Sequence, residues 1–257
     1  MPRIIAIANQ KGGVGKTTTA VNLASALAIL GQKVLLVDAD PQANASSGLG
    51  LRQHQPNLYH VLLGDISPDK ALAETRYPKL KILPSSIDLI GCEVELSKKK
   101  GREHLLAKVL ASLVNGFDYI LIDCPPSLGL LTVNALTSAQ AVLIPLQCEY
   151  YALEGLGLLI NTIRLVKHNF NPRLFLYGIL LTMYDGRNRL TKQVENEVRT
   201  HFKKAVFETV IPRNIRLSEA PSHGKPIFAY DASARGARAY MALAQEILKR
   251  EVSLGQR

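Results

Sequence analysis

The chain alternates short, nearly continuous apolar runs with longer segments of helical periodicity. Such runs are typical of parallel strands buried on both faces. They occur at residues 4–8, 33–40, 80–83, 118–123, 141–145, 174–181 and 206–211. Helices are expected over residues 17–30, 102–114, 151–168, 188–203 and 233–250. This alternation predicts an α/β fold, a doubly wound and mostly parallel sheet with helices on both faces.

The size and composition of the chain are consistent with one large core. It has 257 residues, of which 47% are hydrophobic and 20% charged. We therefore expect residues 1–257 to form a single domain. No apolar run is long enough to span a bilayer, and three residues before the first strand leave no room for a signal peptide, so a cytoplasmic location is expected. Residues 51–116 are less regular, and their role is not predicted.

The cysteines indicate a reduced protein. Cys92, Cys124 and Cys148 form no C-x-x-C pair, and their number is odd. This argues against a disulfide framework or a zinc site and favours buried thiols.

A glycine-rich loop follows the first predicted strand and leads into the first predicted helix. Glycines at 12, 13 and 15 allow successive backbone N–H groups to converge on an anion at the positive end of that helix. Lys16 adds a full charge at the β- and γ-phosphates, Thr17 offers a hydroxyl to Mg²⁺, and Thr18 lies near the α-phosphate. The loop therefore predicts a binding site for ATP or ADP with Mg²⁺. Its expected residues are Lys11, Gly12, Gly13, Val14, Gly15, Lys16, Thr17 and Thr18.

Carboxylates end two of the predicted strands. Asp123 closes the strand over 118–123, where a Walker B aspartate would hold Mg²⁺, although an aspartate at this place can equally cap the next helix. Asp38 and Asp40 end the second strand. Ligands collect at the carboxyl ends of parallel strands, so these groups are expected beside the phosphates.

Positive charge is concentrated in the second part of the chain. The net charge is +10, and residues 151–257 carry 17 Lys and Arg against 9 Asp and Glu. Eight basic side chains lie close together in the sequence: Arg187, Arg189, Lys192, Arg199, Lys203, Lys204, Arg213 and Arg216. Such clustering favours a nucleic-acid backbone as partner. On charge alone, a solvated helix face explains it equally well.

Several motifs together resemble the ParA/MinD family of ATPases. The loop K-G-G-x-G-K-T-T has Gln10 in place of the first glycine of a standard P-loop and carries an additional lysine, Lys11, as in the deviant Walker A motif. The patterns D-x-D-P-Q-x-N after residue 37 and D-x-P-P from Asp123 also fit. Segments 182–187 and 211–221 resemble the chromosomal ParA (Soj) branch, and the likeness extends from residue 4 to residue 248.

The resemblance implies roles for residues around the nucleotide. Two ATP-bound subunits would pair face to face, and Lys11 of each would touch the nucleotide of the other. Lys11, Lys16 and Asp40 would serve catalysis, with Asp40 orienting the attacking water. Thr17 and Asp123 would hold Mg²⁺, and Asp38 would support them.

The resemblance also implies a base site and a DNA surface. Pro212 and Asn214 would pack on adenine. Arg187 and Arg216 would bind nonspecific double-stranded DNA in the dimer, which places the protein on the nucleoid. A ParB/Spo0J-type protein would stimulate the weak hydrolysis of ATP that releases the dimer. Whether the cargo is a chromosome or a plasmid is left open.

Two other functions remain as alternatives. A MinD-like ATPase binds the membrane through a C-terminal amphipathic helix, but residues 246–257 hold too few large apolar side chains to anchor well, so no membrane contact is expected. A regulator of replication initiation that switches between monomer and dimer is the other alternative. Retention on DNA only with ATP would favour the partition function.

Overall fold

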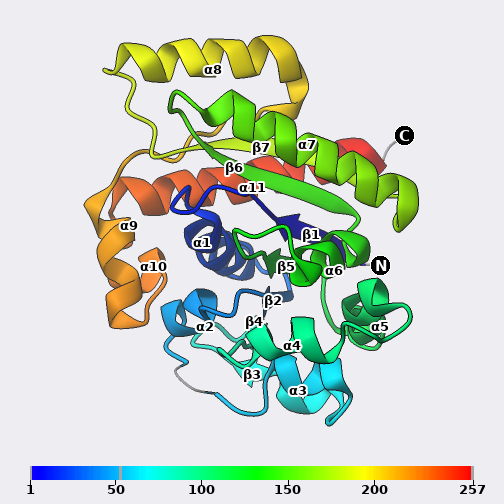
Figure 1. Cartoon of the computed structure of the whole chain (residues 1–257). Helices are drawn as coiled ribbons and strands as arrows, with labels where there is room; N and C mark the ends of the chain where they lie inside the picture. Colours follow the sequence, from blue (N-terminus) through cyan, green and yellow to red (C-terminus); the bar gives the residue numbers. More distant parts are fainter. Residues whose placement is uncertain (1, 52–53, 256–257) are drawn as a thin grey trace.

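One seven-stranded sheet organises the computed structural model, which describes residues 2–51 and 54–255. The strand order within these residues is β3-β4-β2-β5-β1-β6-β7 (Figure 1). Neighbouring strands run parallel, except that β3 is antiparallel to β4. The predicted α/β class and its mostly parallel sheet are confirmed. Residues 1, 52–53 and 256–257 of the predicted single domain lie outside the described part.

The strands are β1 (Arg3–Ile7), β2 (Val34–Asp38), β3 (Ala73–Glu74), β4 (Leu80–Leu83), β5 (Tyr119–Asp123), β6 (Ala141–Gln147) and β7 (Phe175–Thr182). The α-helices are α1 (Lys16–Ile29), α2 (Asn44–Gly48), α3 (Leu58–Leu63), α4 (Leu89–Glu95), α5 (Leu105–Ala111), α6 (Leu130–Ser138), α7 (Ala152–Asn169), α8 (Arg189–Phe202), α9 (Ile215–Glu219), α10 (Ile227–Tyr230) and α11 (Arg235–Gly255). The 3₁₀ turns are η1 (Pro68–Ala71), η2 (Arg102–His104), η3 (Val114–Gly116), η4 (Lys203–Ala205) and η5 (Ala220–His223).

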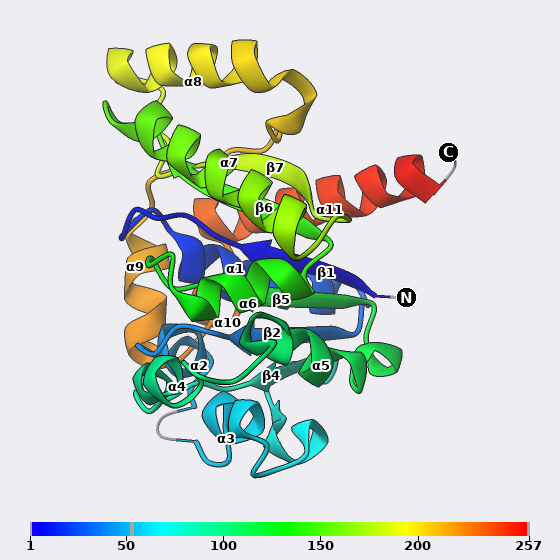
Figure 2. The same cartoon turned by 45° about the vertical axis from the view of Figure 1, so that its right-hand side comes forward.

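Apolar side chains cover both faces of the sheet. One core joins alternate strand residues to α1 and α11, and the other joins the remaining strand residues to α5, α6 and α7. Figure 2 shows these two groups of helices with the sheet between them. Because both faces are covered, the central strands need continuous apolar sequences, which is why they stand out in the chain.

The register of the central strands brings their carboxyl ends together. Ile7 of β1 and Asp38 of β2 are both paired with Asp123 of β5. The carboxylates that end β2 and β5 therefore lie side by side, next to the loop that leaves β1. This is the edge at which open α/β sheets bind ligands.

The predicted strand over residues 206–211 is wrong. Within the described residues, Val206 forms only an isolated bridge with Ile179, and a second bridge joins Tyr184 to Pro212. The backbone N–H groups of residues 208 and 209 instead donate to the carboxylate of Glu246 on α11, at 3.0 and 2.9 Å. The backbone N–H groups of Phe207 and Ile211 still donate to carbonyls of β7, at 2.9 and 2.8 Å, so the Glu246 carboxylate interrupts the pairing between them. The local pattern does not reveal this contact.

Other predicted elements exist with different bounds. The strand expected over 33–40 ends at Asp38, and the helix expected over 102–114 is divided into η2, α5 and η3. The short strand β3 was not predicted. Across the described residues, no helix has both the length and the apolar character needed to cross a membrane. The segment 246–257, predicted to be too poor in large apolar side chains to anchor well, includes residues 256–257, which lie outside the described part.

Gly178 of β7 allows residues 205–207, at the start of the wrongly predicted strand, to pack closely against β7. A Cβ at this position would lie 2.5 Å from the ring of Phe207 and 3.0 Å from the carbonyl oxygen of Ala205. Gly178→Ala should therefore lower the free energy of unfolding by about 1–3 kcal/mol through overpacking. Urea denaturation measures this effect.

Gly155 of α7 is the matched control, since a Cβ there meets nothing within 4 Å. Gly155→Ala should raise stability by about 0.5–1 kcal/mol because alanine is the better helix former. Equal unfolding midpoints for the two variants would contradict the close packing at Gly178.

Candidate functional site

The glycine loop connects β1 to α1 and is held from both sides. Asn9 accepts a hydrogen bond from the backbone N–H of Lys11 at 3.0 Å and donates to the carbonyl of Pro145 at 2.7 Å. Thr182 donates to the carbonyl of Val14 at 2.8 Å. Gly15 has φ +87° and precedes α1, which no side chain caps. The fixed loop therefore leaves the positive end of a 14-residue helix open to an anion.

Lys16 lies beneath this loop, with 7% of its surface exposed. Its Nζ donates to the carbonyl of Lys11 at 3.0 Å. Burial lowers the pKa of Lys16, and the charges of Asp123, Cys124 and Asp40 oppose that shift. The loop thus encloses a lysine whose nearby charged partners are carboxylates at the strand ends.

Asp123 is fully buried, and little around it compensates a negative charge. Its two carboxylate oxygens accept no well-formed hydrogen bond from the described residues, and the hydroxyl of Thr17 and the charge of Lys16 are the nearby groups that favour its charged form. Burial raises the pKa of Asp123 well above its ordinary value, and Asp38 adds to the shift, while Thr17 and Lys16 oppose it. The alternative role as a helix cap is not seen, because α6 begins at Leu130 after Gly129. A buried carboxylate with so little compensation fits a cation.

Asp38 holds the chain that leaves β2. Its Oδ2 accepts hydrogen bonds from the backbone N–H and the hydroxyl of Ser46, at 2.8 and 2.7 Å. Its Oδ1 accepts from the backbone N–H of Asp40 at 3.3 Å. Burial raises the pKa of Asp38 to about 6, although the bonds from Ser46 act in the opposite direction. The structure thus shows Asp38 bound to α2, in contrast to the unpartnered Asp123.

Asp40 lies just beyond, almost buried. Its Oδ1 accepts from the backbone N–H of Gln42 at 2.9 Å, and its carbonyl accepts from the hydroxyl of Ser85 at 2.6 Å. Asp40 is close enough to affect the pKa values of Lys16 and Asp123. The structure therefore brings the three predicted carboxylates and Lys16 into one cluster.

Lys11 points to a different neighbour. Its Nζ forms an ion pair with Glu149, and both side chains are nearly half exposed. Glu149 lies between β6 and α7, where the next two side chains, Tyr150 and Tyr151, are 76% and 67% exposed. The sequence did not identify Glu149 as a partner of Lys11. The lysine thus lies at the outer rim of the loop, next to exposed aromatic rings.

A pocket of about 420 Å³ lies on one side of the loop. Gly15 and Thr18 line it from the loop and α1, and Pro212 and Asn214 line it from the segment after β7. The side-chain oxygen of Asn214 is buried and has no hydrogen-bond partner among the described residues. The structure therefore brings the two predicted base-site residues beside the P-loop.

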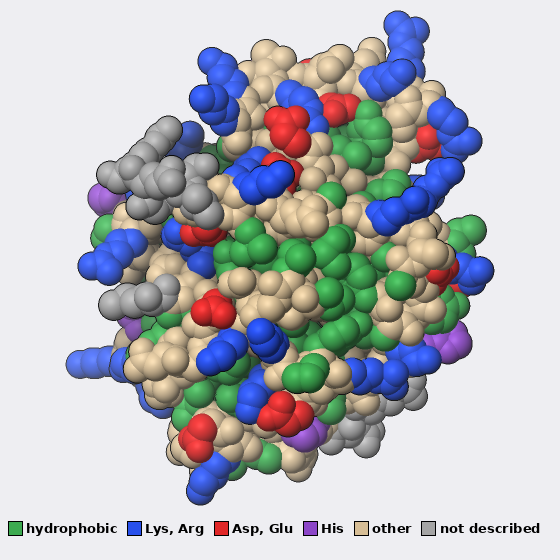
Figure 3. All heavy atoms as spheres, turned by 180° about the vertical axis from the view of Figure 1, so that it is seen from behind, with side chains coloured by type: hydrophobic (Ala, Val, Ile, Leu, Met, Phe, Trp, Pro, Cys, Tyr) green, Lys and Arg blue, Asp and Glu red, His purple; other side chains and the backbone are tan. Residues whose placement is uncertain are grey.

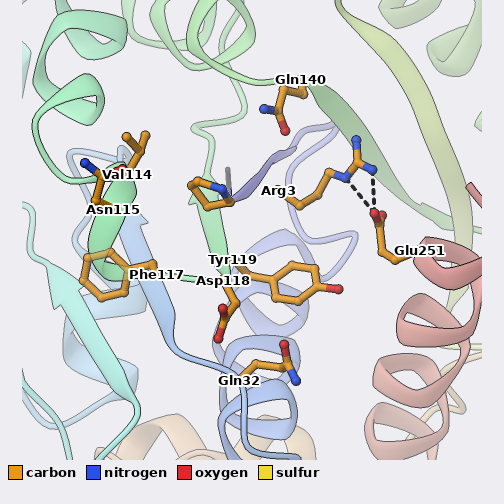
Figure 4. Close-up of a pocket in the computed structure, with 10 residues that line it drawn as sticks. Arg3, Gln32, Val114, Asn115, Phe117, Asp118, Tyr119, Gln140 and Glu251 are labelled. Atoms are coloured by element: carbon orange, nitrogen blue, oxygen red, sulfur yellow. Dashed lines mark hydrogen bonds and ion pairs between the residues drawn. The ribbon is translucent and has the colours of Figure 1, made fainter. Parts of the chain in front are cut away.

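A second pocket, of about 570 Å³, opens at the amino ends of the strands (Figure 4). Arg3, Asp118 and Tyr119 line it, and Arg3 forms two hydrogen bonds with Glu251 across it. No P-loop residue lines this pocket. It is therefore separate from the candidate site.

The two predicted DNA-binding arginines are exposed on adjacent segments. Arg187 is 91% exposed and pairs with Asp185 through two hydrogen bonds of 2.9 Å. Arg216 is 54% exposed and pairs with Glu219 at 2.9 Å. The bridge between Tyr184 and Pro212 brings their segments together.

Basic side chains also stand out around α8 on the face seen in Figure 3. Arg199 is an exception within the predicted cluster. Its guanidinium bonds to Glu195 at 2.8 Å and to the carbonyl of Phe207 at 3.3 Å. Only 30% of the Arg199 side chain is exposed, so this residue offers less surface to a partner than Arg187 or Arg216.

The described residues contain no preformed metal site. In residues 2–51 and 54–255, no three His, Cys, Asp or Glu side chains are grouped to hold an ion. The three cysteines are buried free thiols, as predicted, and burial raises the pKa of Cys92 to about 12. A cation at Asp123 would therefore need further ligands from a bound molecule, as Mg²⁺ receives from phosphates.

Comparison with known proteins agrees with this geometry. A family model described as "AAA domain" matches residues 2–176. The chromosome partitioning protein ParA of Myxococcus xanthus is 55% identical over 97% of this chain and 89% of its own length. The chromosome-partitioning ATPase Soj of Treponema pallidum is 51% identical over the full length of both chains.

A solved structure is similar over nearly the whole chain. It is described as cobyrinic acid a,c-diamide synthase from Mycobacterium smegmatis with bound ADP and magnesium. It is 40% identical, covers 98% of this chain and 96% of its own, and gives a TM-score of 0.87. The motifs, the fold and the full-length relatives lead to one assignment: the chain belongs to the ParA/Soj family of chromosome-partitioning ATPases, which have a P-loop of the ParA/MinD type.

Proposed function

We propose that this protein is a single-domain ATPase that dimerises on ATP, binds nonspecific DNA as the dimer and leaves it after hydrolysis. The observation that carries the proposal is the buried cluster of Lys16 and Asp123 under an open P-loop. A triphosphate would place negative charge at Lys16 and at the uncapped end of α1. The relatives' names and the ADP and magnesium in a similar structure support this proposal.

Thr17 and Asp123 would hold Mg²⁺ together with phosphate oxygens. The unpartnered carboxylate of Asp123 fits this role, because a cation would satisfy both of its oxygens. Mg²⁺, when bound, neutralises charge on the phosphates. Asp38 would act in support, since its bonds to Ser46 and Asp40 fix the chain beside the cation.

Asp40 would orient the attacking water. In a loose phosphoryl-transfer transition state, positioning contributes more than strong basicity. The bonds from Gln42 and Ser85 hold this residue in place next to the charge cluster. Slow intrinsic hydrolysis follows from such an arrangement, and a ParB/Spo0J-type protein would accelerate it.

Lys11 would reach the nucleotide of a second copy. Its side chain lies at the exposed rim of the loop and contacts Glu149 instead of its own phosphate-binding backbone. Exchanging an exposed ion pair for a triphosphate costs little, because such pairs contribute at most about 1 kcal/mol. The exposed rings of Tyr150 and Tyr151 offer apolar surface beside it for the same contact.

Pro212 and Asn214 would bind the adenine base. Their pocket opens beside Gly15 and Thr18, so it lies within reach of a nucleotide on the P-loop. The unpartnered oxygen of Asn214 offers an acceptor for the adenine amino group. On the neighbouring surface, Arg187 and Arg216 would contact DNA phosphates, and a dimer would present both arginines twice.

Removal of the rim lysine should prevent ATP-dependent pairing. Lys11→Ala should remain monomeric in light scattering with Mg²⁺ and ATP, while ATP binding changes little because Lys16 remains. The exposed Lys70 provides the control, and Lys70→Ala should pair like the wild type. Normal pairing of Lys11→Ala would exclude the contact between subunits.

Removal of the water-orienting carboxylate should uncouple binding from turnover. Asp40→Ala should bind ATP and pair, but its kcat should fall by about 10²-fold or more. Phosphate release measures the turnover, and the exposed Asp65→Ala should keep the wild-type rate. An unchanged kcat in Asp40→Ala would remove this residue from the mechanism.

Removal of an exposed arginine should weaken DNA binding uniformly across sequences. Arg187→Ala and Arg216→Ala should each reduce the slope of log affinity against log salt by about 1 for each phosphate that the arginine neutralises. Fluorescence anisotropy of a labelled duplex with ATP tests this. Arg164 on α7 is exposed but outside the predicted basic cluster, so Arg164→Ala should match the wild type. Wild-type slopes in both variants, with binding to anionic liposomes, would favour the membrane alternative.

A further inference from the structure

Two glycines from distant parts of the sequence meet backbone to backbone behind the nucleotide site. Gly50 has φ +85° and Gly224 has φ +60°. A Cβ on Gly224 would lie 2.8 Å from the Cα of Gly50, and a Cβ on Gly50 would lie 3.2 Å from the carbonyl oxygen of Gly224. Both the conformation and the space therefore require glycine at this contact.

The Gly50 side of the contact leads to the candidate nucleotide site. Asp38 accepts the backbone and hydroxyl hydrogen bonds of Ser46, so its carboxylate holds α2. The backbone N–H of Gly50 in turn donates to the carbonyl of Ser47, at 2.9 Å. These bonds connect Asp38 to Gly50 through α2.

The Gly224 side leads to Arg216. Glu219 accepts hydrogen bonds from Arg216 at 2.9 Å and from the hydroxyl of Tyr230 at 3.0 Å. The ring of His223, next to Gly224, is stacked on Tyr230 with 4.9 Å between the ring centroids. These contacts make α9, η5 and Gly224 one unit that carries the exposed arginine.

A pocket of about 240 Å³ separates the two sides next to the contact. Thr17 and Thr18 line it from the start of α1, Asn44 and Ser47 from α2, and Pro221 from η5. Thr17 and Thr18 are P-loop residues, so both flanks of the glycine contact border the nucleotide site.

We propose that the Gly50–Gly224 contact is a positioning element that couples the nucleotide site at Asp38 to the DNA-binding arginine Arg216. The proposal rests on the proposed function, since it assumes that ATP controls DNA binding. When ATP and Mg²⁺ fill the site, α2 presses on Gly224 and reorients the unit that holds Arg216. The backbones of Gly50 and Gly224 touch without side chains between them. A movement of α2 therefore moves Gly224 as well, because close-packed backbones cannot be compressed.

The substitution Gly224→Ala tests the coupling. The measured quantity is the ratio of the duplex Kd with ADP to the Kd with ATP, by fluorescence anisotropy at fixed salt. The ratio should fall by about 3- to 30-fold, the range typical of residues that modulate coupling between sites. The affinity for ATP itself should stay within about threefold of the wild type, because the P-loop is unchanged.

Gly64 supplies the matched control. It also has positive φ, +94°, but a Cβ there meets nothing within 4 Å. Gly64→Ala also places an alanine at positive φ, but without a steric clash, and should keep the wild-type ratio. A wild-type ratio near one would overturn the proposed function and the coupling with it. A high wild-type ratio that Gly224→Ala retains would overturn the coupling alone.

Hydrogen exchange on the wild type gives a second test that does not depend on folding of the variant. The N–H groups of Gly224 and Lys225 donate to the carbonyls of Pro221 and Ala220, at 2.9 and 3.2 Å. Their protection should differ between the ADP and ATP states, together with that of residues 44–50. Identical protection at 224 and 225 in the two states would overturn the proposal.

Discussion

The buried carboxyl group of Asp123 at the carboxyl edge of the sheet is the constraint on which the rest of the structure depends. Asp123 is fully enclosed without a well-formed hydrogen bond from the described residues, beside Lys16, which is also almost buried. Keeping a carboxylate in such a place costs free energy. Functional sites commonly retain groups that lower stability. A cation and a triphosphate bound as proposed would offset this cost, so ligand binding would raise the stability of the protein.

The surrounding elements place this cluster and connect it to the surface. The pairing of β1, β2 and β5 sets the positions of the P-loop, Asp38 and Asp123 relative to one another. From there, α2 leads to the glycine contact beside η5, and the rim residue Lys11 faces outward toward Glu149. Two segments therefore lead from the charge cluster to the surface, one to the exposed Lys11 and one to the segment that carries Arg216.

The sequence predicted the parts that depend on residue type at fixed spacing. Phosphate binding requires glycine, lysine and threonine at set positions, so the P-loop was found without the structure. Contacts between distant segments were not predictable, because no local pattern marks Glu149 as the partner of Lys11 or Gly224 as the neighbour of Gly50. The wrong strand over 206–211 has the same origin, since the carboxylate that binds its backbone comes from Glu246 on α11. The roles of the individual site residues stay predictions.

Thermal unfolding of Asp123→Asn tests most directly whether this buried carboxyl group is linked to the ligands. The Tm of the variant and of the wild type is measured for the protein alone, with ATP, and with ATP plus Mg²⁺. We expect the variant alone to unfold at a temperature equal to or higher than the wild type, because a costly buried carboxylate is gone. We also expect that Mg²⁺ adds no stabilisation to ATP in the variant, while it does in the wild type. A variant that keeps the full Mg²⁺-dependent increase in Tm would contradict this role of Asp123.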